Sequence, residues 1–413
     1  MRIGLIAPPW LPVPPPSYGG TEVVVDNLAR GLQELGHDVR LFTVGESTCP
    51  VHRDYLYPAG VVPIGTSIEE AAHVLAAYEA LADVDIIHDH TVLGPLLAAR
   101  SGAVGPPVVT THHGPFTPEN RRIYADIARH VPVVAMSRSQ AHHAVGVPIA
   151  AVIYHGIDLD IFTPGAGNGG HLVFVGRMSR VKGVHRAVRI AHEAGWPIVV
   201  AVTIRDRAEQ DYFRQEVEPL LLATDALMLD APLTMRLDAL RGAAALINPI
   251  TWPEPFGLVM AEALACATPV LAFGNGAAPE IVDDGVTGFL RTDEAGLVDA
   301  VGRIDQLDRA ACRAAAEQRF SLQRMARDYA AFYRRVLDTA PAPARCPVTP
   351  APARRPVTPA PARRAVTPAP ARRAVTAAPA RRAVTAAPAR RAVPLTRTGI
   401  TTQKLASTTR SVR

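Results

Sequence analysis

Two carboxylates eight residues apart carry the strongest chemical signal in this sequence. They are Glu254 and Glu262, in the run WPEPFGLVMAEA at 252–263. The apolar residues around Glu262 predict a largely buried helix, and a buried carboxylate needs a partner. Two adjacent hydroxyl groups of a ligand suit it, because a carboxylate can accept a hydrogen bond from each; a structural arginine is the alternative. Glu254 comes just before this helix, whose free N–H groups can hold an anionic ligand beside it.

Two cations follow a predicted strand at 172–175. The strand runs directly into Gly176-Arg177, and Lys182-Gly183 begins five residues after Arg177. Cations beside glycines at the carboxyl end of a parallel strand suit a diphosphate, because they can approach its charge closely. The alternative is that both are ordinary surface charges.

A pair of glycines closes the loop after the first predicted strand. Gly19-Gly20 precedes a predicted helix at 21–35, and glycine there lets backbone N–H groups approach an anion. A plain glycine turn is the alternative. The dinucleotide fingerprint, GxGxxG with an acidic residue ~20 positions later, is absent from this stretch. That absence counts against a nicotinamide-dependent oxidoreductase.

Three short runs suggest a metal site: Asp83-x-Asp85, Asp158-x-Asp160 and His88-Asp89-His90. The first two have the spacing of the DxD motif of metal-dependent transferases. The histidines lie where a predicted strand leaves the sheet, a place typical of a hydrogen-bonded loop residue or a substrate contact. We therefore expect no metal site.

Strands alternating with helices must position these residues. Predicted strands lie at 3–7, 39–44, 85–88, 108–111, 133–135 and 151–153, and again at 172–175, 198–202, 244–248 and 269–272. A glycine-rich break at 163–170 separates the two series. The pattern predicts an α/β protein with two Rossmann-like, doubly wound domains facing a cleft, at 1–165 and 170–320. A helix at 321–338 has one apolar stripe and is expected to pack across both domains.

The last 75 residues differ in composition from the rest. Beyond Asp338 stand fifteen Lys or Arg and no acidic residue, whereas residues 1–338 hold 28 basic and 38 acidic residues. From Val348 a nine-residue unit, VTPAPARRP or a close variant, repeats five times. Such a sequence cannot bury enough apolar surface to fold, so residues 339–413 are predicted to be a disordered basic tail. Its role is either that of a solvated appendage or that of a binder of lipid headgroups, nucleic acid or an acidic protein.

Together the motifs resemble family 4 of the retaining, nucleotide-sugar-dependent glycosyltransferases, the glycosyl transferases group 1. The resemblance spans residues 1–338 in the family's order. It includes THHG at 111–114, SRSQ at 137–140, HGID at 155–158 and PEIVDDGVTG at 279–288. The sequence departs from the family at Ala267, where Gly is frequent, and at His155, where Asn is frequent. Neither position belongs to the residues expected to act.

The resemblance implies the GT-B fold, with the acceptor bound mainly by the first domain and the donor mainly by the second. It implies catalytic roles beside the transferred sugar for His113 and Glu254. It implies that Glu262 binds the ribose of the donor. It implies that the side chains of Arg177 and Lys182 bind the diphosphate. It also implies that backbone N–H groups of Gly20, Phe256, Gly257 and Leu258 bind the diphosphate or the sugar. No metal and no cofactor besides the nucleotide sugar are expected.

The expected function is retaining transfer of a sugar from a nucleoside-diphosphate donor, with UDP the common one in the family. The acceptor is a hydroxyl of a glycan, a lipid or a small molecule. A GT-B UDP-sugar epimerase or hydrolase and a non-catalytic sugar-nucleotide binder are the alternatives.

Four dispersed cysteines, a short first apolar run and no stretch of ~18 apolar residues predict a cytoplasmic protein. The basic tail adds an expected peripheral contact with the anionic inner face of the membrane. No specific nucleic-acid partner is expected.

Overall fold

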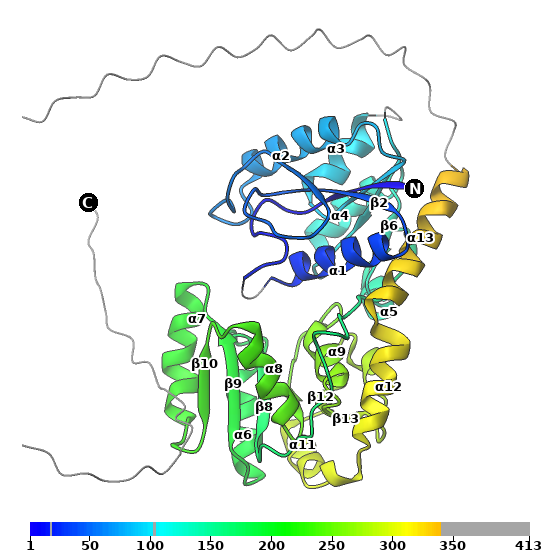
Figure 1. Ribbon diagram of the computed structural model, residues 1–413. Coiled ribbons are helices and arrows are strands. Elements are labelled where there is room, and N and C mark those ends of the chain that lie inside the picture. The colour runs from blue at the N-terminus through cyan, green and yellow to red at the C-terminus, as the bar shows by residue number, and fades with distance from the viewer. Residues whose placement is uncertain (17–18, 102–104, 340–413) are drawn as a thin grey trace, which may run out of the picture. The chain divides into compact units, whose positions relative to one another are not determined.

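The computed structural model describes residues 1–16, 19–101 and 105–339. The described residues form two α/β domains, each built on one parallel sheet (Figure 1). Residues 340–413 lie outside the described part of the chain. The predicted disordered tail falls in this segment, so it stays a prediction.

The first domain contains seven parallel strands in the order β3-β2-β1-β4-β5-β6-β7. Its central strands are apolar and buried, as a sheet covered by helices on both faces requires. The strands are β1 (Arg2–Ile6), β2 (Asp38–Thr43), β3 (His52–Tyr55), β4 (Ile86–Asp89), β5 (Val108–Thr111), β6 (Val133–Ala135) and β7 (Ile149–Val152). The helices are α1 (Gly20–Glu34), α2 (Ser67–Ala80), α3 (Leu93–Ser101), α4 (Pro118–Ile127) and α5 (Arg138–His143).

The second domain contains six parallel strands in the order β10-β9-β8-β11-β12-β13. They are β8 (Leu172–Arg177), β9 (Ile198–Thr203), β10 (Ala226–Leu229), β11 (Leu246–Asn248), β12 (Val270–Phe273) and β13 (Gly288–Arg291). Its helices are α6 (Val184–Glu193), α7 (Arg207–Tyr212), α8 (Leu233–Gly242), α9 (Leu258–Ala265), α10 (Ala278–Ile281), α11 (Glu294–Val301) and α12 (Arg309–Phe320). The last helix, α13 (Leu322–Thr339), returns to the first domain.

The strand order reverses at the same place in both sheets. β1 lies between β2 and β4, and β8 lies between β9 and β11. At such a switch point the loops at the carboxyl ends of neighbouring strands diverge and leave room for a ligand. Gly20 follows β1, Arg177 ends β8, and Glu254 follows β11. The fold therefore places these predicted site residues at its two switch points.

The chain passes between the domains twice, and the two passages touch. The Ile157 N–H donates to the Phe320 carbonyl at 2.6 Å, and the Leu322 N–H donates to the Ile157 carbonyl at 3.1 Å. α12 packs on α9 in the second domain, and α13 packs on α1 in the first (Figure 1). Gly31 permits the α1–α13 contact, because a Cβ there would lie 2.9 Å from Ala326 Cβ. The helix predicted at 321–338 thus covers the first domain, and α12 covers the second.

The sequence patterns missed three edge strands, β3, β10 and β13. β3 is the short polar segment HRDY, with three of its four residues exposed, so it has no apolar alternation to detect. Its backbone pairing with β2 makes it a strand. Within the described ranges, no helix combines the length and the apolar character needed to cross a bilayer.

Candidate functional site

Lys182 and Glu254 form the centre of the site in the second domain. Lys182 lies in the turn between β8 and α6, and Glu254 lies between β11 and α9. The Lys182 Nζ lies 2.5 and 2.6 Å from the two Glu254 carboxylate oxygens, and the side chains are 14% and 15% exposed. Gly183 allows the turn, because its φ is +76° and a Cβ would lie 2.7 Å from the Pro249 carbonyl oxygen. The turn thus holds a largely buried cation against a carboxylate at the carboxyl end of the sheet.

Arg177 is held by a different carboxylate. Its guanidinium pairs with Glu209 in α7 and lies 4.0 Å from Asp206. Glu209 is 4% exposed and accepts a hydrogen bond from the Arg205 N–H, while Asp206 caps α7 through the Glu209 N–H. Arg177 is therefore anchored by Glu209, and its buried Nε is left without an acceptor among the described residues.

The N-terminus of α9 presents unused backbone donors. Gly257 has φ +93°, and no side chain caps the helix. Within the described part of the chain, no backbone or side-chain acceptor takes a hydrogen bond from the N–H groups of Phe256, Gly257 or Leu258. The Phe256 ring is buried and packs against His155 at a centroid distance of 5.0 Å, so its backbone is the part available to a ligand. Free N–H groups at the positive end of a helix suit an anion.

Gly20 brings the first domain to this helix end. It is the first residue of α1, and a Cβ built on it would lie 3.7 Å from Leu258 Cδ1. A second link between the domains lies two residues further along α1, at Glu22. Burial raises the pKa of Glu22, and the charge of Arg205 from the second domain partly offsets that rise. The N-termini of α1 and α9 therefore meet at one place.

Glu262 lies one turn inside α9. Burial raises the pKa of its carboxyl, and the charge of Arg236 in α8 partly offsets the rise. Neither Arg236 nor any other residue that the structure describes forms a hydrogen bond or ion pair with this carboxylate. The Arg236 Nε also lacks a described partner. The alternative prediction was that an arginine pairs with Glu262. Arg236 is close enough to affect the pKa of this carboxyl, but the two side chains form no ion pair in the described structure.

His113 belongs to a cluster with His88, His90 and His155. Its Nε2 shares a hydrogen bond of 2.8 Å with His90 Nδ1, and its ring stacks on His155 at a centroid distance of 5.4 Å. The His88 and His90 ring centroids lie 3.9 Å apart. Burial lowers the pKa of His113 to about 3, with the charge of His112 as the smaller cause. His113 is therefore neutral near pH 7, with Nε2 engaged by His90 and Nδ1 available to a ligand.

The three runs that suggested a metal have other partners. Asp83 pairs with Arg40 at 2.8 Å, Asp85 with Arg2 at 2.9 Å, and Asp158 with Arg30 at 2.6 Å. His88 is not in a loop. It lies inside β4, fully buried, and shares hydrogen bonds with Tyr333 at 2.7 Å and Thr111 at 2.9 Å. In residues 1–16, 19–101 and 105–339, no group of three or more His, Cys, Asp or Glu side chains is arranged to hold a metal ion.

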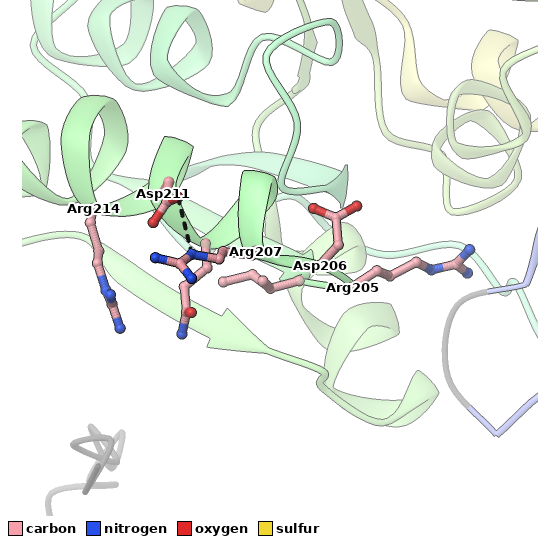
Figure 2. A pocket seen from close by; sticks show the side chains of 7 residues that line it. Arg205, Asp206, Arg207, Asp211 and Arg214 are labelled. Atoms are coloured by element: carbon pink, nitrogen blue, oxygen red, sulfur yellow. Dashed lines mark ion pairs between the residues drawn. The ribbon is translucent and has the colours of Figure 1, made fainter. Parts of the chain in front are cut away.

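A pocket of about 500 Å³ adjoins the Arg177 side of the site. Its lining residues are polar for the most part and belong to the start of α7 and the residues around it: Ile204, Arg205, Asp206, Arg207, Gln210, Asp211 and Arg214. Figure 2 shows Arg207 facing Asp211, with which it forms an ion pair at 3.9 Å, and Arg205 extending away from that pair. The pocket contains none of the predicted site residues. It meets the site through Asp206, which lies beside Arg177.

Sequence reasoning missed several residues that hold the site in place. Glu209 and His90 contact the predicted residues Arg177 and His113 directly. Glu209 had a usable signal, because Asp206-x-x-Glu209 has the spacing of a helix capping box. His90 had a weaker one in the HDH run, whose histidines were expected to be hydrogen-bonded loop residues or substrate contacts. The predicted residues of the second domain lie around the carboxyl end of its sheet, and Gly20 lies beside them. His113 is connected to them by ring contacts, because it stacks on His155, whose ring packs against Phe256.

Two family models match the chain one after the other. Glycosyltransferase Family 4 matches residues 18–161, and Glycosyl transferases group 1 matches residues 169–306. The chain belongs to glycosyltransferase family 4. Each matched range lies within one of the two parallel-sheet domains, and the fold of this family 4 member is GT-B.

Curated relatives match part of the chain. The D-inositol 3-phosphate glycosyltransferase of Mycolicibacterium paratuberculosis is 34% identical over 163 residues, which cover 36% of this chain and 37% of that protein. The alpha-maltose-1-phosphate synthase of Mycobacterium tuberculosis is 37% identical over 124 residues, covering 29% of this chain and 32% of that protein. The matched part thus spans about a third of the length of these curated relatives.

Solved structures match across both domains. A glycosyltransferase involved in avilamycin A biosynthesis is 28% identical, with a TM-score of 0.60, and the match covers 82% of this chain and 98% of that one. HepE of Anabaena, solved with UDP and glucose, is 20% identical with a TM-score of 0.65, over 82% of this chain and all of that one. The second likeness establishes the fold alone.

Proposed function

We propose that this family 4 member is a retaining glycosyltransferase, which moves a sugar from a nucleoside-diphosphate donor to an acceptor hydroxyl without a metal. One observation carries the proposal. Among the residues that the structure describes, the N–H groups at the start of α9 have no acceptor, and the Glu262 carboxylate, four residues further along the helix, has no hydrogen-bond or ion-pair partner. Lys182 contacts Glu254 just before this helix. Four residues rise about 6 Å along a helix axis. That spacing suits a diphosphate at the helix end and a ribose beside Glu262.

The leaving group is the nucleoside diphosphate, on which negative charge grows as the sugar departs. Lys182, Arg177 and the N–H groups of Phe256, Gly257 and Leu258 oppose that charge. In the free protein the two cations are paired with Glu254 and Glu209. Donor binding exchanges those carboxylates for phosphate oxygens. Preorganised donors aimed at developing charge lower the barrier most in a site shielded from water.

Glu254 and His113 act on the sugar in this proposal. Once the diphosphate draws Lys182 away, the Glu254 carboxylate accepts hydrogen bonds from sugar hydroxyls. His113 is neutral, so it shares a hydrogen bond with a sugar hydroxyl without adding charge to the electron-poor sugar ring. The acceptor hydroxyl then attacks the face from which the diphosphate leaves, assisted by the departing phosphate. The family resemblance supports this retaining course.

UDP is the first donor nucleotide to test, since the structural neighbour HepE was solved with UDP and glucose. D-inositol 3-phosphate is the first acceptor to test, because a curated relative is named for it. An epimerase or hydrolase would consume the donor without an acceptor. Analysis of products formed with and without acceptors therefore separates these activities from transfer.

Calorimetric titration of the protein with UDP-glucose, UDP-GlcNAc, GDP-mannose and ADP-glucose, in the presence of EDTA, tests the donor site. We expect one donor to bind. We expect Glu262→Gln to weaken that binding about tenfold to a hundredfold, because a charged hydrogen-bond partner contributes about 1.5–3 kcal/mol. Glu317→Gln, an exposed carboxylate on α12, is the matched control. Donor binding that Glu262→Gln leaves unchanged contradicts the ribose role.

The tail adds a proposed membrane contact at the inner face. Its fifteen basic residues and lack of acidic ones favour anionic lipid surfaces, which attract polybasic segments. We expect removal of residues 340–413 to abolish sedimentation with vesicles containing phosphatidylglycerol at low salt, while neutral vesicles bind neither form. Equal binding of the truncated and full-length protein to the anionic vesicles contradicts the contact.

A further inference from the structure

One buried amide holds the backbone on both sides of His113. The Gln140 Nε2 donates to the His112 carbonyl at 2.8 Å and to the Gly114 carbonyl at 2.7 Å. Its Oε1 accepts a hydrogen bond from the Met136 N–H at 2.9 Å. Gln140 is 3% exposed, so these bonds form away from bulk water. Because both amide hydrogens are used on carbonyl groups of the two residues next to His113, the position of its ring depends on where Gln140 lies.

The helix that carries Gln140 is held by a carboxylate from the other domain. Glu280 in α10 accepts the Arg138 N–H at 2.8 Å on Oε2 and the Ser139 N–H at 2.7 Å on Oε1. These are the first two N–H groups of α5. The Tyr154 hydroxyl also donates to Glu280, at 2.8 Å. One carboxylate of the donor-binding domain thus fixes the start of α5 in the first domain.

These two sets of bonds form one continuous connection. It runs from Glu280 to the first turn of α5, through Gln140 on that turn, and to the carbonyl groups of His112 and Gly114. The Ser137 Oγ accepts the Gln140 N–H at 2.9 Å and keeps that first turn intact. Hydrogen bonds of 2.7–2.8 Å form both ends of the connection, the backbone of α5 joins them, and both domains contribute.

We propose that Gln140 is the positioning residue for His113 and that Glu280 couples this position to the second domain. The proposal rests on the proposed function, in which His113 faces the sugar of a donor bound by that domain. The coupling would place the His113 ring correctly when the two domains hold the arrangement described here. A movement of α10 away from α5 would release the His113 loop.

Two isosteric substitutions break the connection at different points. Gln140→Glu keeps an acceptor for the Met136 N–H and loses both donors to the carbonyls. Glu280→Gln keeps the shape and loses the charge that holds the two N–H groups. The matched controls are Asn120→Asp and Asp283→Asn. Asn120 donates to the Pro115 carbonyl and lies 3.3 Å from the His112 Nε2, but it does not hold the His112 or Gly114 carbonyl. Asp283 pairs with Arg319 of its own domain.

The first readout needs no activity. Hydrogen–deuterium exchange of the segment 111–116 in the free protein should speed up in Gln140→Glu and in Glu280→Gln, and stay at the wild-type rate in Asp283→Asn. Glu280 is only partly buried, so we expect the Glu280→Gln variant to fold. If Gln140→Glu does not fold, Glu280→Gln alone tests the connection. Unchanged exchange in Glu280→Gln overturns the coupling. If no nucleotide sugar is turned over by the wild type, the proposed function fails and this measurement alone decides the inference.

The second readout is the split between binding and turnover. We expect Gln140→Glu to lower kcat about tenfold to a hundredfold, the effect of a small misplacement of a reacting group, with the donor Kd unchanged. We expect Glu280→Gln to lower kcat less, and the double variant to be no slower than Gln140→Glu, since both act through one connection. A double variant as slow as the product of the two single effects overturns the proposal. So does a Gln140→Glu enzyme as fast as Asn120→Asp.

Discussion

We expect Lys182→Ala to lower kcat/KM for sugar transfer about a thousandfold, which corresponds to about 4 kcal/mol of transition-state stabilisation. The Lys182 side chain is 14% exposed and touches both oxygens of Glu254, so its charge acts in a poorly hydrated place. There it opposes the charge that develops on the departing diphosphate. The substitution also leaves Glu254 beside the sugar without its cation. Steady-state kinetics with a nucleotide sugar and its acceptor measure the effect.

The matched control for this prediction is Arg180→Ala. Arg180 lies two residues before Lys182, but its side chain is 65% exposed and pairs with Glu216 away from the site. An exposed pair of this kind contributes little, so we expect kcat/KM to stay within about twofold of wild type. Thermal unfolding of both variants separates a loss of chemistry from a loss of fold. If Lys182→Ala stays within tenfold of the wild type and remains folded, Lys182 does not stabilise the leaving group.

The second large effect is on stability: we expect the free energy of unfolding to fall steeply below about pH 6.5. Burial lowers the pKa of His73 to about 4 and that of His113 to about 3, and it lowers the pKa values of His88, His90 and His155 well below the ordinary value. In the unfolded chain these groups titrate near 6.5. Between the folded and unfolded pKa values the unfolded chain therefore binds more protons, and stability falls as the pH falls.

The size of the effect follows from proton linkage. Each imidazole that stays neutral in the folded protein removes about 1.4 kcal/mol of stability per pH unit below 6.5. Burial raises the pKa of Asp89 to about 6, and this carboxyl acts in the opposite direction as the pH falls from 6. It offsets about one imidazole, so the histidines still decide the sign.

Denaturant unfolding at pH 7, 6 and 5 measures this dependence. We expect His73→Gln to make the slope shallower by about 1.4 kcal/mol per pH unit, because His73 lies fully buried outside the His113 cluster. His142→Gln removes an exposed imidazole and should leave the slope as it is. Stability that is flat between pH 7 and 5 contradicts the buried, neutral state of these histidines.

Much of the fold could be predicted from local pattern. Apolar strands such as 172–175, a glycine turn and then a helical stripe recur along the chain, and each signal lies within about 30 residues. Regular alternation of this kind leaves few topologies open, because parallel strands need helical crossovers. The site segments were predictable for the same reason, since ligand-binding residues follow the carboxyl ends of strands. The polar edge strand β3 carried no such signal and was missed.

The sequence by itself therefore determined the two-domain α/β architecture, the family and the segments that carry Lys182, Glu254 and Glu262. The tertiary structure alone decided what each charged or polar group contacts. Lys182 and Glu254 are 72 residues apart in the chain, and Glu280 reaches Ser139 across 141 residues. Side-chain partners at such separations are set by how sheets and helices pack, and desolvation depends on what covers a group. Side-chain partners and desolvation cannot be predicted from local residue spacing. The neutral state of His113 and the hydrogen bonds by which Gln140 holds its loop are therefore visible only in the folded chain.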